Sequence, residues 1–318
     1  MTIALLLEKL FLWGVLYSFI GWVYETILVS AQERRFVNRG FLNGPLCPIY
    51  GAGAVLGIVL LTPLQGYPVT IFFLGAIGAC LLEYVTSWTM EKLFHARWWD
   101  YSNFRFNLNG RICLLGAVVF GIGGLVVLEI TQPVVVRITD LLPQQWLHLA
   151  AGVLIVLIGV DLTITVVGFS GFYERLADFA ADLRQTAGDL KQTASGAAGR
   201  LKRDGAAMVP DAVSNAMTGA VGTLHTVAGN AGNRIRGMSG LPISTANRMY
   251  EKLTDVLSDQ QKRMIRSFPH LRANGYTDII VQLRERLVSG QSNSSGQSSP
   301  DGRSDLNGRA SSDDSDPR

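Results

Sequence analysis

Residues 147–169 read LHLAAGVLIVLIGVDLTITVVGF, and this stretch decides the fold class. It contains one acidic side chain, Asp161, and no lysine or arginine. A helix of about 20 largely apolar residues is long enough to cross the hydrocarbon core of a bilayer, which is roughly 30 Å thick. The stretch is therefore predicted to be a transmembrane helix.

Four earlier stretches have the same character, at about 10–30, 49–64, 70–94 and 112–130. The second of these is short and is preceded and opened by prolines, so it is predicted to be either a tilted span or a re-entrant segment. Together with residues 147–169, the four stretches predict an all-α integral membrane protein built on a bundle of about five transmembrane helices.

Composition changes after about residue 170, where the chain becomes polar and rich in alanine, glycine and serine. We expect residues 1–170 to form the transmembrane domain and the remainder to form a cytosolic, mostly helical tail. The tail is predicted to contain an amphipathic helix over 171–204, a linker over 205–245, a short helical unit over 246–288 and a disordered segment over 289–318.

The charge and the cysteines exclude several classes of function. The net charge of +3 among 318 residues gives no concentrated basic stripe, so a nucleic-acid partner is not expected. Cys47, Cys80 and Cys113 are too few and too widely spaced for a disulfide framework or a zinc site. No metal and no cofactor is therefore assigned.

The basic residues of the short connections predict the orientation. The connections 31–48 and 95–111 carry three arginines each, whereas 65–69 carries no lysine or arginine and 131–146 carries only Arg137. Basic residues next to membrane spans are retained on the cytosolic side. We therefore expect the N-terminus outside, and both arginine-bearing connections and the C-terminal tail inside.

Three acidic residues, Glu25, Glu83 and Asp161, fall inside predicted spans. A charged side chain at the centre of a transmembrane helix costs about 2.5 to 3.5 kcal/mol, so such groups usually face a cavity or a partner. In the predicted orientation all three lie in the cytosolic half of their helices. They predict an acidic intramembrane pocket open to the cytosol; the alternative is hydrogen bonding between helices that serves assembly alone.

The two arginine-bearing connections also mix aromatic residues with glycine or proline. In one interpretation Arg39 and Arg111 lie at the mouth of the acidic pocket, where they pair with the acids or bind an anionic head group. In the other, the arginines only orient the protein, and Trp98, Trp99 and Tyr101 anchor the chain at the membrane interface. Both interpretations stay open at this point.

Repeated small residues, such as Gly53-x-x-x-Gly57, let helix backbones approach closely in a membrane. Such contacts are expected within the bundle, with a seam between two copies of the chain as the alternative.

The following motifs occur within about residues 10–130: Gly21-Trp22-x-x-Glu25, Asn38-Arg39-Gly40-Phe41-Leu42-x-Gly44-Pro45-x-Cys47-Pro48-Ile49-Tyr50-Gly51, Glu83-Tyr84, Met90-Glu91-x-x-Phe94, Trp98-Trp99-Asp100-Tyr101-Ser102 and Asn107-x-x-Gly110-Arg111-Ile112. They resemble the bacterial family described as putative ABC-transporter permeases of the CmpB type (type IV). Residues Arg266 to Pro269 resemble a short closing segment of the same proteins. The loop residues that the resemblance makes candidates are Asn38, Gly40, Gly44, Pro45, Cys47, Pro48, Tyr50, Glu91, Trp98, Trp99, Asp100, Tyr101, Asn107 and Gly110.

The resemblance implies a permease or transporter component in the bacterial cytoplasmic membrane, with an unidentified substrate. The sequence contains no Gly-x-x-x-x-Gly-Lys-[Ser/Thr] nucleotide loop, so any ATPase is expected to be a separate subunit. Two alternatives are a membrane scaffold whose tail recruits partners and an enzyme that acts on lipid-linked substrates at the interface. The sequence offers no serine beside a base and no metal-ligand cluster, and we assign no catalytic residue.

Overall fold

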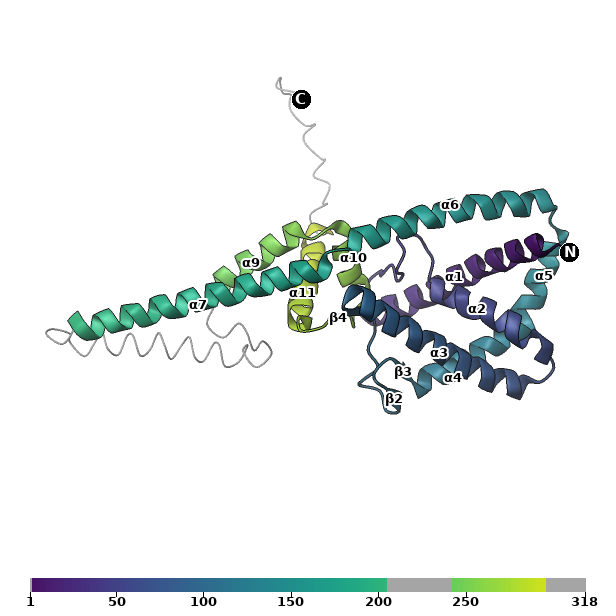
Figure 1. Ribbon diagram of the computed structural model, residues 1–318, viewed down its shortest axis with the longest axis horizontal. Helices are drawn as coiled ribbons and strands as arrows, with labels where there is room; N and C mark the ends of the chain where they lie inside the picture. Colours follow the sequence, from purple (N-terminus) through teal and green to yellow (C-terminus); the bar gives the residue numbers. More distant parts are fainter. Residues whose placement is uncertain (1, 205–241, 296–318) are drawn as a thin grey trace, which may run out of the picture.

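The computed structural model describes residues 2–204 and 242–295, with the backbone alone over 198–204 and 290–295, and most of this is helical (Figure 1). The first half contains α1 (Ile3–Glu33), α2 (Pro48–Leu61), the 3-10 turn η1 (Thr62–Leu64), α3 (Pro68–Phe94), α4 (Leu114–Leu125), the π-helical segment η2 (Val126–Thr131), α5 (Gln132–Leu141) and α6 (Gln144–Phe169). The tail contains α7 (Phe172–Asp204), α9 (Ile243–Val256), α10 (Asp259–Ser267) and α11 (Thr277–Ser295). Four short strands are β1 (Ala96–Arg97), β2 (Asn107–Leu108), β3 (Ile112–Cys113) and β4 (Arg272–Ala273).

Four helical segments in the described part of the chain are long and apolar enough to cross a membrane, and they begin at Ile3, Pro68, Leu114 and Gln144. A fifth, Pro48–Leu64, is apolar but shorter. The outer faces of these helices expose many large apolar side chains, which is the surface that a lipid solvent favours. The predicted fold class, an all-α multi-pass membrane protein, is confirmed.

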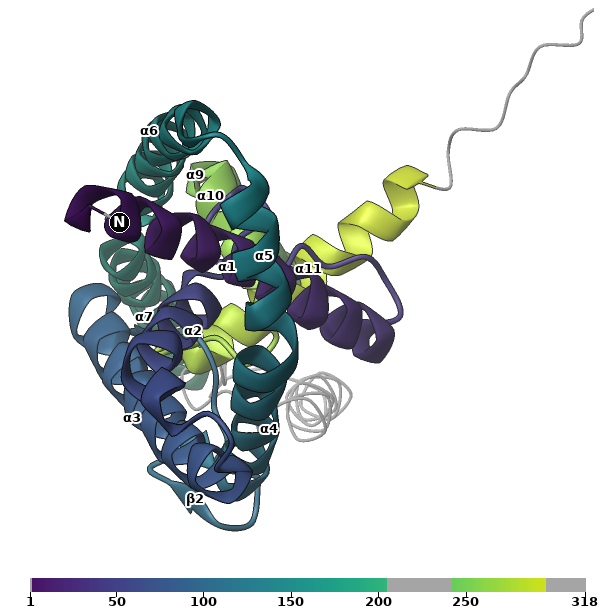
Figure 2. The same ribbon diagram turned by 90° about the vertical axis from the view of Figure 1, so that its right-hand side faces the viewer.

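The two arginine-bearing connections lie at the same end of the bundle, together with α9, α10 and α11 (Figure 1). The N-terminus and the connection between α5 and α6 lie at the opposite end. We refer to these as the tail end and the N-terminal end. In the view along the bundle, α6 lies at one edge and α3 and α4 lie at the other (Figure 2).

The connection between α1 and α2 is the least regular part of the bundle. After α1 ends at Glu33, residues 34–47 turn back and run beside α1 as far as Ser18. The distance from Glu33 to Ser18 along a helix is about 22 Å at 1.5 Å per residue. We call residues 34–47 the re-entrant loop. It is held to α1 by the N–H of Val37 to Ser30 Oγ (2.9 Å), of Arg39 to Thr26 Oγ1 (3.3 Å) and of Cys47 to the Ser18 carbonyl (2.9 Å).

α2 therefore starts beside the middle of α1 and continues toward the N-terminal end. Pro48 is its first residue, a position where the missing N–H of proline leaves no hydrogen bond unmade. The sequence left a span and a re-entrant segment open for this region. In the structure, residues 48–64 form an apolar helical segment that is shorter than the four candidate spans, and it starts beside Ser18 after the non-helical residues 34–47.

The fourth predicted span is longer than the sequence indicated. Residues Leu114–Leu141 form one continuous helical segment, so most of the predicted 131–146 connection is helical and only Leu142 and Pro143 remain as a turn. Pro133 lies in the first turn of α5, directly after the π-helical segment. The wider π-helical turn places the proline where the backbone needs no donor from it, so the helix is not broken.

The tail helices form a unit that packs against the tail end. α9 packs on α7 through Tyr250 and Leu253, and β4 pairs with β1 in the register Ala96 to Ala273. We call residues 242–295 the C-terminal cap. Its core is continuous with that of the bundle, through buried aromatic side chains that include Trp98, Phe169, Phe172 and Phe268.

The helical unit predicted over 246–288 is divided into α9, α10 and α11. α10 is separate from α9 because Ser258 caps it and forms a reciprocal capping box with Gln261. The predicted disordered segment begins in a helix, since α11 extends to Ser295. Most of the predicted linker and residues 296–318 lie outside the described residues.

Close packing of α1 on α2 gives a first prediction. A Cβ atom at Gly51 would overlap with the Gly14 carbonyl and with Ser18 Oγ, whereas a Cβ atom at Gly57 would meet nothing within 4 Å. Gly51→Ala should therefore destabilise the protein by roughly 1 to 3 kcal/mol, and Gly57→Ala should be neutral or slightly stabilising. Thermal aggregation of the detergent-solubilised protein, followed by size exclusion, measures both. Equal midpoints for the two variants would contradict the packing described.

Candidate functional site

Asp161 holds the re-entrant loop in place from the opposite side. Its Oδ1 accepts hydrogen bonds from the Asn43 backbone N–H (2.9 Å) and side-chain amide (3.0 Å), and its Oδ2 accepts one from the Gly44 N–H (2.8 Å). Thr165, one turn further along α6, donates to the same carboxylate at 3.2 Å. A carboxylate in α6 thus satisfies backbone donors of a loop that inserts between helices.

Glu25 lies in a different environment, between α1, α2 and the re-entrant loop. Its Oε1 accepts a hydrogen bond from the Tyr50 hydroxyl at 2.6 Å, and its Oε2 lies 3.3 Å from Arg39 Nε. The Arg39 side chain is mostly buried, at 14% exposure. Glu25 and Arg39 thus form an ion pair inside the bundle.

Glu83 is buried without a cation beside it in the described structure. Its side chain accepts one hydrogen bond, from the Tyr101 hydroxyl at 3.1 Å, and the residue is 6% exposed. Burial, Glu83 and Glu25 all raise the pKa of the Tyr101 phenol, and Glu83 is the acid to which the phenol donates its hydrogen bond. We refer to Glu25, Tyr50, Glu83 and Tyr101 as the acid–tyrosine cluster.

The structure thus divides the three predicted acids between two places. Glu25 and Glu83 share the acid–tyrosine cluster, while Asp161 is engaged with the re-entrant loop. Two surface grooves in the described part of the chain, of about 410 and 360 Å³, are apolar and contain no acidic side chain. In this structure the three acids therefore bind other residues of the chain, and none of them lines either groove.

Arg111, in the second loop, lies against a stripe of polar side chains on α3 that begins at Glu83. The stripe consists of Glu83, Ser87 and Glu91, which are spaced four residues apart and so share one helix face. Arg111 is 8% exposed, donates to Ser87 Oγ at 3.1 Å and pairs with Glu91 at 2.8 Å. Arg97 pairs with the same Glu91 carboxylate at 3.1 Å. Arg111 is thus fixed within the second loop and does not contact Glu25 or Glu83 by any described hydrogen bond.

Arg39 joins the membrane bundle to the cap. Besides Glu25, its guanidinium donates to the Ser267 carbonyl at 2.9 Å and stacks over the Phe268 ring at 4.3 Å. Arg263 of the cap donates in return to the carbonyls of Gly40 and Phe41, at 3.1 and 2.7 Å. The cap therefore covers the re-entrant loop at the tail end through charge-assisted hydrogen bonds in both directions.

The other candidate residues of the re-entrant loop and of the start of α2 stabilise the conformation of the loop. Trp22 Nε1 donates to Asn38 Oδ1 at 2.7 Å, and the Cys47 thiol donates to the Arg39 carbonyl at 3.1 Å. A Cβ atom at Gly40 would lie 3.0 Å from the Leu46 carbonyl, so a larger residue there would crowd the loop. Gly44, Pro45, Pro48 and Tyr50 form the turn into α2 and its first residues.

The second loop is similarly packed around Asp100. Burial would raise the pKa of the Asp100 carboxyl, but the backbone N–H and hydroxyl of Ser102 and the neighbouring Arg272 and Arg97 lower it overall. Gly110 has a φ of +67° and donates to Asn107 Oδ1 at 2.9 Å, which favours glycine at that position. Trp99 donates to the Arg111 carbonyl at 3.0 Å.

The aromatic side chains of this loop differ from the expected interface anchors. Trp98 is 3% exposed and stacks with Phe94 and Phe268 in the core, and Tyr101 binds Glu83. The exposed aromatic residues are instead Phe104 and Phe106, at 45% and 68%.

Sequence reasoning missed the residues of the cap and of α1 that complete this site. Arg263 carried no recognisable motif, although it lies three residues before the Arg266-Ser-Phe-Pro269 segment that resembled the family. Thr26 and Ser30, which bind the re-entrant loop, are polar residues one turn apart in α1. That spacing was the available signal, because it places two hydroxyl groups on one helix face.

Removal of the Asp161 carboxylate should release the re-entrant loop. Asp161→Ala leaves the N–H groups of Asn43 and Gly44 without this acceptor, and the part-buried Gly44 N–H alone costs about 1 to 3 kcal/mol. We expect the buried Cys47 thiol to react with maleimide several times faster in this variant, with the other two cysteines replaced by serine. Thr163→Ala on the same helix removes only a bond to the Gly159 carbonyl and is the matched control. Unchanged labelling of Cys47 in Asp161→Ala would show that the carboxylate does not hold the loop.

Residues 12–166 match the model of the family ABC_trans_CmpB, described as "Putative ABC-transporter type IV". The match runs from α1 to near the end of α6 and so includes Glu25, Arg39, Glu83, Arg111 and Asp161. No curated protein and no solved structure matches the chain. The membrane domain of this chain, which carries the re-entrant loop and the acid–tyrosine cluster, is therefore similar to the CmpB-type family of ABC-transporter proteins, as its motifs indicated.

Proposed function

We propose that this chain is a membrane permease component of an ABC-type transport system in the bacterial cytoplasmic membrane. The family description and the multi-pass bundle support this assignment. The tail end faces the cytosol, because both arginine-bearing connections lie there and basic residues are retained on that side. A separate ATPase subunit supplies the energy at the same side, since the sequence has no nucleotide loop of its own.

The observation that carries the proposal is the re-entrant loop. Non-helical backbone at membrane depth is tolerated only where protein or a water-filled cavity covers it, and broken spans of this kind form the substrate sites of many transporters. In this chain the loop ends where α2 begins, and Tyr50 of α2 binds Glu25. Substrate is therefore expected to pass or bind where the loop, Glu25 and Glu83 meet.

Arg39 gives this site a connection to the cap. One guanidinium binds the intramembrane acid Glu25 and the Ser267 carbonyl of the cap. A substrate that competes for either Glu25 or Arg39 weakens the hold of Arg39 on the cap. The conformation described here is thus a closed one, and transport requires the cap and the re-entrant loop to separate at the tail end.

A membrane scaffold is the second candidate. Its support is the 33-residue helix α7, of which the family match includes no part. A scaffold would bind partners through α7 and would not depend on the intramembrane acids.

The orientation is tested by single cysteines in a chain whose own three cysteines are replaced by serine. A cysteine at Asn103, an exposed position of the second loop, should react only with reagents supplied from the cytosol. A cysteine at Leu142, which is 45% exposed between α5 and α6, should react only from outside. The opposite pattern would reverse the bundle and remove the ATPase from the tail end.

The transport assignment is tested with tagged protein purified from the native membrane. We expect an ATPase subunit to co-purify, and ATP hydrolysis by the complex to fall by about tenfold or more in the double variant Glu25→Gln and Glu83→Gln. The double variant should fold, because glutamine keeps the shape and the hydrogen bonds from both tyrosines. Arg39→Lys should also reduce hydrolysis, since an ammonium group cannot hold Glu25 and the cap in the same planar geometry.

Glu129→Gln is the matched control, because Glu129 is an acid of the N-terminal end whose carboxylate accepts, within the described part of the chain, the Gly66 N–H alone at 3.2 Å. Normal hydrolysis in the double variant at normal protein levels would reduce both acids to assembly contacts. Co-purification of other proteins without an ATPase would favour the scaffold.

A further inference from the structure

Two parts of the membrane domain carry the same sequence signals in the same order. The first signal lies at a helix end and reads Glu25-x7-Glu33-Arg34-x-Phe36 in α1 and Glu83-x7-Glu91-Lys92-x-Phe94 in α3. The second lies at a loop end and reads Leu42-Asn43-Gly44-x-x-Cys47 before α2 and Leu108-Asn109-Gly110-x-x-Cys113 before α4. We call residues 3–61 and 68–125, which contain these signals, the first unit and the second unit.

The two units follow the same course through the bundle. α1 and α3 run from the N-terminal end to the tail end (Figure 1), and each is followed by a left-handed residue, Arg34 with a φ of +53° and His95 with a φ of +52°. A loop then turns back, and Cys47 and Cys113 form the N-caps of α2 and α4. α2 packs on α1, and α4 packs on α3.

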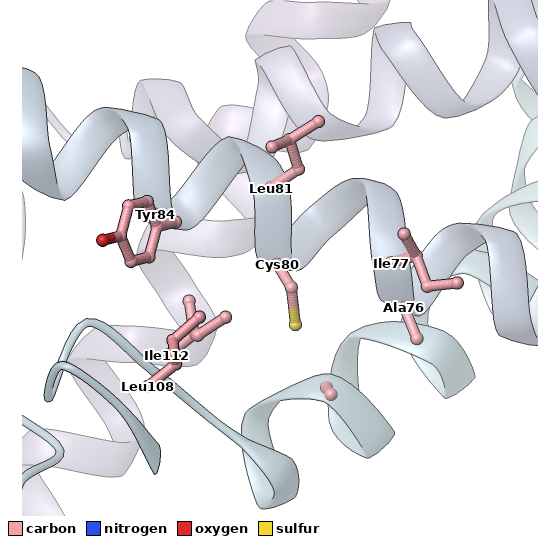
Figure 3. Close-up of a pocket in the computed structure, with 8 residues that line it drawn as sticks. Ala76, Ile77, Cys80, Leu81, Tyr84, Leu108 and Ile112 are labelled. Atoms are coloured by element: carbon pink, nitrogen blue, oxygen red, sulfur yellow. The ribbon is translucent and has the colours of Figure 1, made fainter.

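The second loop, residues 95–113, corresponds to the re-entrant loop of the first unit. Its Leu108 and Ile112 line an apolar groove together with Tyr84 of α3 (Figure 3). Tyr84 lies ten residues before the end of α3, so the second loop returns by about 15 Å along that helix. α4 therefore begins beside the middle of α3, as α2 begins beside the middle of α1.

The inner acids of the two units, Glu25 and Glu83, have matching partners. Each accepts a hydrogen bond from a tyrosine of its own unit, Glu25 from Tyr50 at 2.6 Å and Glu83 from Tyr101 at 3.1 Å. The units differ in one respect, since Glu25 also pairs with Arg39. Sequence, course and contacts thus agree in showing one helix–loop–helix pattern twice.

The outer acids, Glu33 and Glu91, connect both units to the cap. Glu33 accepts two hydrogen bonds from Arg284 of α11, each at 2.7 Å. Glu91 accepts one from the side-chain amide of Asn274 in the cap at 3.4 Å. The cap therefore bridges the two units at the tail end, where it limits their separation.

Each unit is held together internally by close and directional contacts. Glycines bring its two helix backbones together, Gly51 against Gly14 in the first unit and Gly124 against Gly75 in the second. Each loop is hydrogen-bonded to the preceding helix of its own unit. Such a unit is expected to move as one body.

Contacts between the units are of a different kind. Among the described residues, no hydrogen bond or ion pair joins the first unit directly to the second. Tyr50 meets Phe120 with ring centroids 6.4 Å apart, and a Cβ atom at Gly53 would lie 3.4 Å from Leu82 Cδ2. Tyr50 binds the inner acid of the first unit and Leu82 precedes that of the second, so this interface lies beside both inner acids. Packed helices can slide at an apolar interface without breaking directional bonds.

We propose that residues 3–61 and 68–125 are two repeats of one structural unit, and that substrate passes between them when they move relative to each other. The passage of substrate rests on the proposed transport function, whereas the movement of the units does not. Transporters built from parallel repeats have their substrate sites at the interface between the repeats, near the middle of the membrane. Both units contribute an acid and a tyrosine beside this path, and the cap controls its opening at the tail end.

Cysteine reactivity tests the movement without an ATPase, in the full chain with its own three cysteines replaced by serine. Gly53→Cys places a thiol between the units, and Gly14→Cys places one within the first unit. Arg284→Gln removes the contact that joins the first unit to the cap. N-ethylmaleimide should then label Gly53→Cys several times faster and Gly14→Cys at an unchanged rate.

Arg286→Gln is the matched control for Arg284→Gln, because Arg286 lies on the same helix and binds Asn247 within the cap at 2.6 Å. It should change neither labelling rate. Faster labelling of both Gly53→Cys and Gly14→Cys in Arg284→Gln would show general loosening, and unchanged labelling of both would show that the units stay together. Either result would overturn the movement of two units.

Cross-linking tests the passage of substrate. A short bifunctional methanethiosulfonate should join Gly53→Cys to Leu82→Cys across the interface, and Gly14→Cys to Val55→Cys within the first unit, since both glycines lie against these side chains. The cross-link between the units should lower ATP hydrolysis by the native complex about tenfold or more, reversibly with dithiothreitol. The cross-link within the unit should leave hydrolysis unchanged.

Normal hydrolysis with the cross-link between the units in place would overturn passage between them. An equal loss with both cross-links would mean that the helices inside a unit also move, which contradicts the proposal as well. Absence of an ATPase would contradict the proposed transport function instead, and the labelling rates would still decide whether the two units move.

Discussion

The polar backbone of the re-entrant loop is the constraint on which the rest of this bundle depends. A buried N–H or C=O group without a partner costs several kcal/mol in hydrocarbon, where no water can replace the missing hydrogen bond. Each side of residues 34–47 therefore needs a structural element that supplies donors or acceptors. α1 supplies Ser30, Thr26 and the Ser18 carbonyl, α6 supplies Asp161, and the cap supplies Arg263.

The charged groups inside the bundle follow from the same requirement. Asp161 is stable in α6 because three N–H groups of the loop and the Thr165 hydroxyl surround its carboxylate. Glu25 has a cation and a phenol, whereas Glu83 has a phenol alone. Among the described residues, Glu83 is thus the acid of the three with the fewest hydrogen-bond and ion-pair partners.

The cap extends this polar framework out of the membrane. Its contacts with the loop are charge-assisted and involve backbone carbonyls, while its core of aromatic and aliphatic side chains is continuous with Trp98 and Phe169 of the bundle. Two kinds of interaction thus act at one interface. The apolar core stabilises association of the cap with the tail end, and the arginines fix its register over the loop.

The sequence by itself determined that the chain is an α-helical membrane protein, because apolar stretches long enough to span a bilayer have few other solutions. It also identified Glu25, Glu83 and Asp161 as unusual, since a charged side chain inside a transmembrane helix costs free energy. The motifs of both loops were recognisable from the sequence as well. Only the tertiary structure decided that Asp161 holds Asn43 and Gly44 while Glu25 holds Arg39. Hydropathy reports how much apolar surface a segment offers to lipid, but it does not report which group a charge binds. The partner of Asp161 is Asn43, 118 positions away, and no local pattern encodes that contact.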